Sequence, residues 1–385
     1  MDKTTISTDT DLGASFGVLL AKWYAAHKRD LPWRHTQDPY LIWLSEIILQ
    51  QTRVAQGLPY YQKFVAAYPT VITLAAASEE EVLRLWQGLG YYSRARNMHL
   101  TARIIVQQYG GQFPRNYASL LKLKGIGPYT AAAIASFAFN EPVAVVDGNV
   151  FRVLARLLGI HENISSPKGK QTFSQHAQQL LQASMPDVEP ATFNQAIMEF
   201  GAIHCTAVAP ACKQCIFQQQ CYAYRYQAQQ QLPVKAKKMK VRKRRFLYFI
   251  FQYQDKILVK QRGSGDIWQG LYDFPTIVAD EPMPPQYYLL HAIYQQIERF
   301  MPLHQLAAGI QLPQYPLQIT SISAPFKHQL THQLLQIQFV QLTVLAADLW
   351  EQLCYLPQMQ VVTTSQLEHL PKPVLLANYL QEQFF

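Results

Sequence analysis

Cysteine is scarce in this chain of 385 residues, and long apolar runs are missing from it. Four of the five cysteines lie close together and only Cys354 stands apart, which argues against a secreted protein held together by disulfides. No apolar stretch approaches the roughly 18 residues of a membrane-spanning helix. The N-terminal segment MDKTTISTDTD is polar and acidic, without the apolar core of a signal peptide. These absences favour a soluble cytoplasmic protein with no membrane partner.

Acidic residues are absent from residues 235–245, where the segment KAKKMKVRKRR carries eight basic residues. This segment holds most of the formal net charge of +9. A basic run between two differently patterned regions is as typical of a solvated linker as of a nucleic-acid contact, so the charge alone leaves both interpretations open.

The clustered cysteines follow the pattern C-x6-C-x2-C-x5-C, formed by Cys205, Cys212, Cys215 and Cys221. Thiolates this close in sequence converge on one centre more readily than they pair as disulfides, which indicates a structural zinc or a [4Fe–4S] cluster. Zinc sites usually contain two C-x2-C knuckles, and this run contains one. The spacing therefore favours the cluster and leaves zinc open, with His204 as a spare ligand candidate.

Hydrophobic periodicity divides the chain into two regions. Apolar residues recur at three- and four-residue spacing up to about residue 225, which predicts a mostly α-helical region at 1–225. The segment RFLYFIFQYQDKILVKQR, from Arg245 onward, predicts a β-hairpin that turns at Gln254 and Asp255. Further strands are predicted at 334–345 and 359–364, and a helix at 286–300. We therefore expect an all-α region, a basic linker at 226–245 and an α+β domain at 246–385.

A Gly-Ile-Gly turn directly precedes an Ala-rich helical segment. Gly125 and Gly127 would leave backbone N–H groups and the helix N-terminus facing outward to an anion such as phosphate. An ordinary tight turn needs the same glycines, so this signal is weak by itself.

Two carboxylic acids have contrasting predicted surroundings. Glu46 lies in the middle of an apolar helix, where burial would raise its pKa toward neutrality, unless it reaches water past Trp43. Asp147 precedes a predicted helix and suits an N-cap, which favours the anion but is also a sufficient structural role. A protonated acid beside an ionised carboxylate is the pair that glycoside cleavage uses.

Taken together, LKGIGPYTA, VDGNV and the cysteine pattern resemble the helix–hairpin–helix DNA glycosylases of the endonuclease III superfamily, and within it the adenine DNA glycosylases of the MutY type. Supporting segments are RDLPWR at 29–34, WLSEIILQQT at 43–52 and GLGYYSRARN at 88–97. The resemblance implies a six-helix barrel at about 29–144 and a cluster domain built from about 1–28 and 145–225. It further implies a [4Fe–4S] cofactor and a monomer that acts on double-stranded DNA.

The same resemblance implies base-excision repair of adenine mispaired with 8-oxoguanine or guanine. In that reaction Glu46 protonates adenine at N7, and Asp147, with Asn149 as its polar partner, stabilises the oxocarbenium ion. Wedge residues in the duplex would be Gln50, Gln51 and Tyr91. The pocket for the extruded adenine would draw on Arg29, Leu31, Trp33, Arg34 and Glu199.

Tyr129 bears on the type of reaction. Relatives that also cut the DNA strand carry a lysine at this place, whose amine forms a Schiff base with C1′. Tyrosine cannot form one, so the resemblance predicts monofunctional base removal.

The segment IWQGLYDFP at 267–275 resembles the entry of a Nudix domain. The glutamate set that holds magnesium in such domains is absent from the sequence that follows, so we expect this domain to bind rather than hydrolyse. The resemblance assigns it the recognition of 8-oxoguanine through Leu330, Thr331 and His332.

Two alternatives stay open at this point. A bifunctional pyrimidine-damage glycosylase and lyase would use the same scaffold, although Tyr129 disfavours it. A non-catalytic metal-cluster DNA-binding protein would need neither Glu46 nor Asp147.

Overall fold

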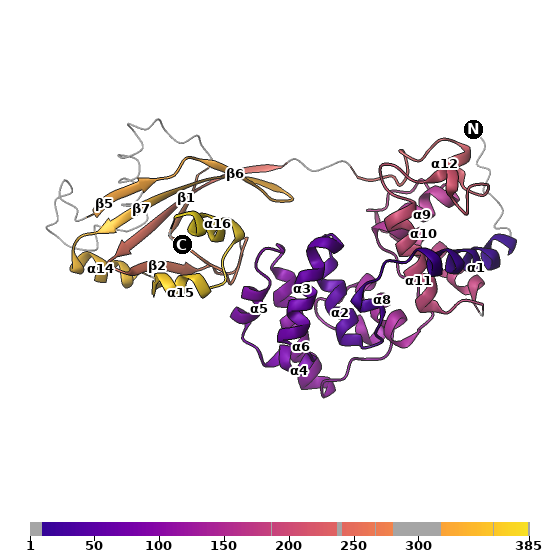
Figure 1. Ribbon diagram of the computed structural model, residues 1–385, viewed down its shortest axis with the longest axis horizontal. Helices are drawn as coiled ribbons and strands as arrows, with labels where there is room; N and C mark the ends of the chain where they lie inside the picture. The colour runs from indigo at the N-terminus through magenta and orange to yellow at the C-terminus, as the bar shows by residue number, and fades with distance from the viewer. Residues whose placement is uncertain are drawn as a thin grey trace. The chain divides into compact units, whose positions relative to one another are not determined.

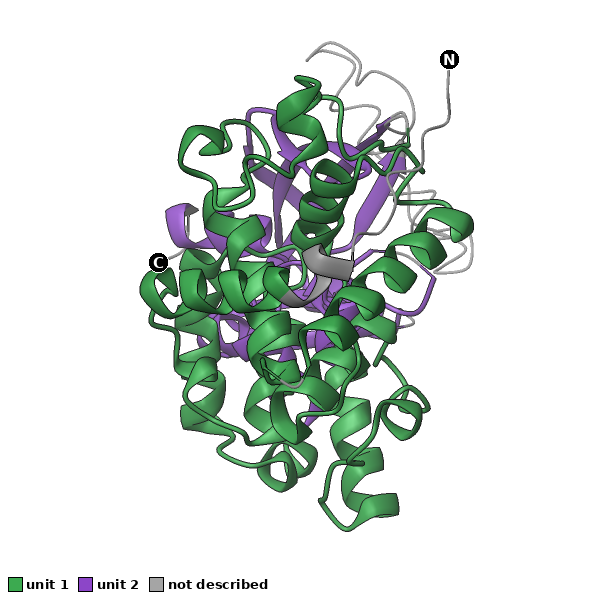
Figure 2. Ribbon diagram, turned by 90° about the vertical axis from the view of Figure 1, so that its right-hand side faces the viewer, with its two compact units in different colours: residues 1–77, 97–237 green, residues 78–96, 238–385 purple. Residues whose placement is uncertain are grey.

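The computed structural model describes residues 10–185, 187–236, 241–265, 267–279, 317–356 and 358–383. The chain forms two compact units, Met1–Ala77 with Asn97–Lys237 and Ser78–Arg96 with Lys238–Phe385, which Figure 2 colours green and purple. The first unit is helical, as the periodicity predicts. Within the described residues, no helix is both long and apolar enough to cross a membrane.

Figure 1 shows the helices of the first unit and labels most of them. They are α1 (Thr10–His27), α2 (Pro39–Leu49), α3 (Val54–Ala67), α4 (Val71–Ala76), α6 (Ser93–Tyr109, whose first residues belong to the second unit), α7 (Tyr117–Leu120), α8 (Pro128–Phe139), α9 (Gly148–Leu158), α10 (Pro167–Ser184), α11 (Pro190–Glu199) and α12 (Tyr222–Arg225), with the short helices η1 (Pro32–Arg34), η2 (Phe200–His204) and η3 (Cys212–Gln214).

Local signals set many of these helix ends. Thr70 forms a capping box with Thr73 at the start of α4, and Ser166 caps α10 with its side chain. Helix α9 ends at Gly159, whose φ of 70° lies in the left-handed region. Glycine adopts that conformation without a side-chain clash, so the helix stops where the sequence provides it.

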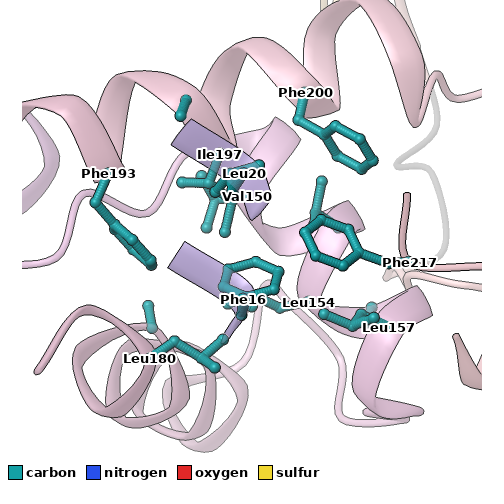
Figure 3. Packing of buried hydrophobic residues seen from close by; sticks show 14 of the residues in the cluster. Phe16, Leu20, Val150, Leu154, Leu157, Leu180, Phe193, Ile197, Phe200 and Phe217 are labelled. Atoms are coloured by element: carbon teal, nitrogen blue, oxygen red, sulfur yellow. The ribbon is translucent and has the colours of Figure 1, made fainter. Parts of the chain in front are cut away.

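One hydrophobic core of the first unit joins the N-terminal helix to the helices that follow Asp147. Figure 3 shows Phe16 of α1 packed among side chains from α9, α10 and α11. The Phe16 and Phe217 rings stack with centroids 4.6 Å apart, and both side chains are buried. Because Phe217 lies inside the cysteine run, this core also supports that run.

The second unit contains a mixed sheet with helices on both faces. Its elements are α5 (Glu79–Leu85), β1 (Arg242–Tyr253), β2 (Lys256–Gln261), β3 (Tyr272–Asp273), β4 (Thr276–Ala279), β5 (Leu317–Ile322), β6 (Phe326–Gln329), β7 (Gln333–Val344), α14 (Ala347–Cys354), β8 (Met359–Thr363), α15 (Thr364–His369) and α16 (Val374–Gln383).

Strands β1 and β7 form the centre of this sheet and run parallel, with Arg242 beside Gln333 and Gln252 beside Thr343. The other pairings are antiparallel, including the β1–β2 hairpin that turns at Gln254, as predicted. Alternate residues of β1 pack against α15 and α16 on one face and against α14 on the other. The predicted strands at 334–345 and 359–364 are confirmed as β7 and β8.

Two predicted boundaries differ from what the structure shows. The linker was expected to extend to residue 245, but β1 begins at Arg242, because pairing with β7 orders the end of the basic run. Residues 78–96 were assigned to the helical barrel, but their contacts group them with the C-terminal unit. The helix predicted at 286–300 lies outside the described residues.

Candidate active site

Glu46 is buried in α2, with 7% of its surface exposed. Most residues of this helix are buried, Trp43 and Glu46 among them, so Glu46 is not an exposed residue at the rim of Trp43. The Tyr129 hydroxyl donates a hydrogen bond to Oε2 of Glu46. Burial raises the pKa of Glu46 to about 7, with the negative charge of Asp147 adding to the rise and the Tyr129 bond opposing it. The prediction that Glu46 is buried and has a raised pKa is confirmed.

Asp147 is the N-cap of α9, as predicted. Its Oδ1 accepts hydrogen bonds from the backbone N–H groups of Asn149 at 2.9 Å and Val150 at 2.8 Å, and its Oδ2 accepts one from the Asn149 amide at 2.7 Å. Asn149 is therefore its direct polar partner. These bonds fix both carboxylate oxygens in one orientation.

The capping bonds lower the pKa of Asp147 as predicted, but the net shift is upward. Burial is the largest effect and raises the pKa of Asp147, while the bonds from Val150 and Asn149 oppose it. The pKa values of both acids are therefore raised, and the two acids differ in their hydrogen bonding instead. Asp147 receives several N–H donors, whereas Glu46 receives one phenol.

The charges of both acids act on the Tyr129 side chain. Burial raises its pKa well above 10, and the charges of Glu46 and then Asp147 raise it further. The phenol therefore stays protonated and acts as a hydrogen-bond donor. Glu46, Tyr129 and Asp147, which lie far apart in sequence, form one cluster, in which Glu46 is buried and the other two side chains are half-buried.

A second buried carboxylate, Glu199, ends α11 and is held by two arginines. Arg29 Nη2 and Arg34 Nη2 each lie 2.6 Å from its Oε2, and further N–H groups of both residues donate to Oε1. Desolvation raises the pKa of Glu199, but the hydrogen bonds from the two arginines lower it more and hold it at about 2. The positive charge of Arg34 also acts on Glu46, so this group adjoins the acid cluster. Of the remaining predicted pocket residues, Leu31 is buried beside η1, and Trp33 packs edge-on against Tyr61.

The predicted Gly-Ile-Gly turn joins α7 to α8 and forms a helix–hairpin–helix. Gly125 needs to be glycine, since its φ is 81° and a Cβ there would lie 2.9 Å from Cβ of Asn97. Gly127 caps α8 without strain, and nothing lies within 4 Å of where its Cβ would be. Both glycines are exposed, so the N-terminus of α8 is open to an anion.

Gln50 and Gln51 follow α2 directly rather than lying within it. Gln50 is the C-cap and donates to Thr130 Oγ1 at 3.3 Å, and Gln51 is exposed with a left-handed φ of 55°. This non-glycine left-handed residue at a turn marks a locally strained position.

The third predicted wedge residue, Tyr91, belongs to the second unit and is 40% exposed. Its hydroxyl contacts Oγ1 of Thr331, which lies with His332 at the exposed tip of the β6–β7 hairpin. Leu330 begins this turn by donating its backbone N–H to Gln333 and packs partly against the core. The structure therefore brings the predicted wedge tyrosine and the predicted recognition loop together.

The four clustered cysteines are neighbours whose charges interact. Burial, and then the charges of other cysteines of the set, raise the pKa of Cys212, and burial raises the pKa of Cys215 to about 11. Within the described residues, no three cysteine, histidine or acidic side chains lie close enough to hold a single metal ion. A tetrahedral zinc site would need sulfur atoms only about 3.8 Å apart.

Two arginines of α9 contact the cysteine run, one of them also reaches Asn149 beside the acid cluster, and the sequence reasoning missed both. Arg152 donates to the Cys205 carbonyl at 2.7 Å and to Oδ1 of Asn149 at 2.9 Å. The buried Arg156 donates to Sγ of Cys205 at 3.5 Å and to the Thr206 carbonyl at 2.7 Å. Arg152 and Arg156 follow Asp147 and are four residues apart, which places both on one helix face. This spacing was the available signal.

Comparison with known proteins agrees with this fold and site. Residues 44–182 match the model of the HhH-GPD superfamily of base excision DNA repair proteins, and residues 247–382 match the NUDIX domain. The chain resembles the solved structure of a thermostable thymine-DNA glycosylase with a TM-score of 0.52 and 29% identity, over 57% of this chain and 100% of that one. Fold and site together define a helix–hairpin–helix DNA glycosylase.

Sequence relatives narrow this class to a family. The adenine DNA glycosylase of Buchnera aphidicola subsp. Baizongia pistaciae is 35% identical over 68% of this chain and 74% of its own length. The human adenine DNA glycosylase is 45% identical over 54% of this chain, but this match spans only 39% of the human protein. The chain belongs to the adenine DNA glycosylase family, a family of base-excision repair enzymes.

Proposed function

We propose that this enzyme hydrolyses the N-glycosidic bond of adenine mispaired with 8-oxoguanine or guanine in double-stranded DNA, as a monomer and without cutting the strand. The observation that carries this proposal is the cluster of the buried Glu46 with the half-buried Tyr129 and Asp147. A carboxyl group with a pKa of about 7 is available as a proton donor at neutral pH. A second carboxylate whose lone pairs are already oriented lies close enough to affect it.

In the proposed reaction, Glu46 gives its proton to N7 of adenine. The bond between N9 and C1′ then breaks with its electron pair going to the base, which leaves as neutral adenine. The oxocarbenium ion left at C1′ is stabilised by the Asp147 carboxylate. Water adds to C1′, and the proton it loses returns to the Glu46 carboxylate. Tyr129 holds Glu46 in place, and Asn149 holds Asp147.

Release of the base without strand cleavage follows from the residue at position 129. The phenol of Tyr129 stays protonated because burial and two neighbouring acids raise its pKa. It cannot form the Schiff base that a lysine would form. Borohydride treatment during turnover should therefore trap no stable adduct, and trapping at high yield would contradict monofunctional release.

The arginine-held Glu199 supports the proposed adenine pocket. Five N–H groups of Arg29 and Arg34 donate to its two oxygens, so the carboxylate is ionised and fixed. An extruded base would meet this anion together with Leu31 and Trp33. Phosphates would bind at the open N-terminus of α8, beside Gly125 and Gly127, and Gln50, Gln51 and Tyr91 would fill the gap in the stack.

The β6–β7 hairpin is the proposed reader of the partner base. Thr331 and His332 are exposed at its tip, where a hydroxyl and an imidazole can form hydrogen bonds with a base edge. Single-turnover cleavage of matched duplexes with adenine opposite 8-oxoguanine, guanine and thymine tests this assignment. We expect the rates to fall in that order, and equal rates would contradict it.

We also propose that the four cysteines hold a [4Fe–4S] cluster rather than zinc. Burial raises the pKa values of the Cys212, Cys215 and Cys221 thiols, and the charges of other cysteines in the run raise them further, so these thiols bind as thiolates only when a strong positive centre compensates them. The cluster would act as a structural staple, and Arg156 would donate to its Cys205 ligand. A broad visible absorption band is expected, and a colourless protein containing zinc would contradict it.

A further inference from the structure

We call residues 86–92 the Tyr91 loop. Side chains within the loop and next to it contact one another. The Trp86 indole N–H donates to the Gly90 carbonyl at 3.0 Å, and Trp86 is fully buried. The Arg94 guanidinium lies over both the Trp86 ring, at 5.1 Å, and the Tyr91 ring, at 5.4 Å. Gly88, Gly90 and Tyr91 have positive φ values of 102°, 72° and 49°. A tyrosine in the left-handed region persists only where its surroundings hold it there.

The surroundings that hold this loop come from the C-terminal domain. Nη1 of Arg96 donates to the Gln269 carbonyl at 2.6 Å, and Nη2 reaches the Gln269 side-chain oxygen at 3.5 Å. On the other side of the loop, the Lys372 backbone N–H donates to Oε1 of Gln87 at 3.1 Å. Gln87 lies at the start of the loop and Arg96 lies just after its end. Each of the two side chains bonds to a different segment of the C-terminal domain.

Helix α5, directly before the loop, packs on the same domain. Gly270 has a φ of 81°, and a Cβ there would lie 3.1 Å from Cδ1 of Leu83 and 3.3 Å from Oε1 of Glu79. Burial and the charge of Glu80 raise the pKa of Tyr272. Contacts at α5, Gln87, Tyr91 and Arg96 explain why residues 78–96 form one compact unit with the C-terminal domain although they interrupt the helical region in sequence.

We propose that Gln87 and Arg96 are positioning residues that clasp the Tyr91 loop to the C-terminal domain, so that Tyr91 and the Leu330–His332 tip meet the DNA as one preformed surface. This inference rests on the proposed function, in which the tip reads the partner base and Tyr91 enters the stack. Arg96 lies in the first turn of α6, which continues without interruption into the helical unit. Contacts with the partner base can thus favour extrusion of adenine, because both depend on the same clasped loop.

Two variants remove the clasp without touching the acid cluster or the hairpin tip. Arg96→Gln removes both donors to Gln269, and Gln87→Leu removes the acceptor for Lys372. Arg103→Gln is the matched control, since it makes the same change on an exposed residue of the same helix. Arg96→Lys keeps one donor and should restore part of the effect. Thermal unfolding of all four variants checks that they fold.

The first measurement needs no DNA. Hydrogen–deuterium exchange of the free full-length protein should show amides of residues 86–92 exchanging about fivefold faster in Arg96→Gln and Gln87→Leu, the effect of losing one hydrogen bond. Arg103→Gln should match the wild type. Unchanged exchange in both clasp variants would overturn the clasp, whatever the enzyme does to DNA.

The second measurement is the ratio of single-turnover kcat/KM for adenine opposite 8-oxoguanine to that opposite guanine. We expect the clasp variants to lower this ratio about fivefold, the lower end of typical coupling between sites. A purely structural role would lower both rates equally and keep the ratio, which would overturn the proposal. A wild-type ratio of one would refute the proposed partner-base function and the coupling with it, while faster exchange would still establish the physical clasp.

Discussion

The acid cluster and the β6–β7 hairpin are built in opposite ways. Glu46, Tyr129 and Asp147 come from three segments far apart in sequence, and their burial, which is deepest for Glu46, raises their pKa values. Thr331 and His332 sit on a local turn and remain exposed. Chemistry on a glycosidic bond needs a proton donor tuned by desolvation, whereas recognition of a base needs side chains that can reach it. Changes in the first region should therefore alter rate and pH dependence, and changes in the second should alter preference.

The largest expected effect is that of Glu46→Gln. Glutamine fills the same space but cannot donate the proton, so adenine release should fall about a thousandfold, while binding of the mispaired duplex is retained. Single-turnover assays and gel-shift titrations measure the two quantities. The exposed Glu189→Gln is the control and should behave as the wild type. Unaffected release by Glu46→Gln, and likewise by Asp147→Asn, would refute the proposed roles.

The next largest effect concerns stability. Glu199→Gln leaves Arg29 and the mostly buried Arg34 without their anion, so the free energy of unfolding should fall by about 2 kcal/mol at pH 7. Because folding lowers the pKa of Glu199 from 4.5 to about 2, its contribution is present above pH 4.5 and is lost as the pH falls toward 2. Urea unfolding of both proteins at pH 7 and pH 3 should show the difference shrinking. A constant difference would mean that charge is not its cause.

The pH dependence of kcat/KM sharpens the contrast further. Glu46 acts in its protonated form, so kcat/KM should fall tenfold for each pH unit above about 7, where the free enzyme loses that proton. The residual activity of Glu46→Gln should lack this break, whereas a Thr331 variant should keep it. A wild-type profile that stays flat to pH 9 would exclude Glu46 as the acid.

The smallest expected effect is that of Thr331→Val. This change removes the hydroxyl that contacts Tyr91 and is available to the partner base, at a cost of about 1 kcal/mol, or roughly fivefold in preference for 8-oxoguanine over guanine. The rate on adenine opposite guanine should change little. The exposed Thr320→Val on β5 serves as the control. Equal losses on both mispairs would assign Thr331 to general DNA binding.

Several elements followed from local sequence patterns. The spacing around Glu46 predicted a buried acid in a helix, and Asp147 before an amphipathic helix predicted an N-cap; both are confirmed. The turn at Gln254 and the strands β7 and β8 were equally readable, since alternation and turn residues act over a few positions. The direction of the Asp147 pKa shift was not readable, because burial depends on packing by distant segments.

The sequence by itself determined the helical periodicity, the order of the motifs and the presence of an acid pair, a glycine turn and a cysteine run. These depend on neighbours within a few residues of one another. Only the tertiary structure decided that Arg152 connects the cysteine run to Asn149, that Arg156 contacts Cys205, and that residues 78–96 pack with the C-terminal domain. Contacts such as that between Arg96 and Gln269 join residues far apart in the chain, and no local preference specifies such a pairing before the chain has packed.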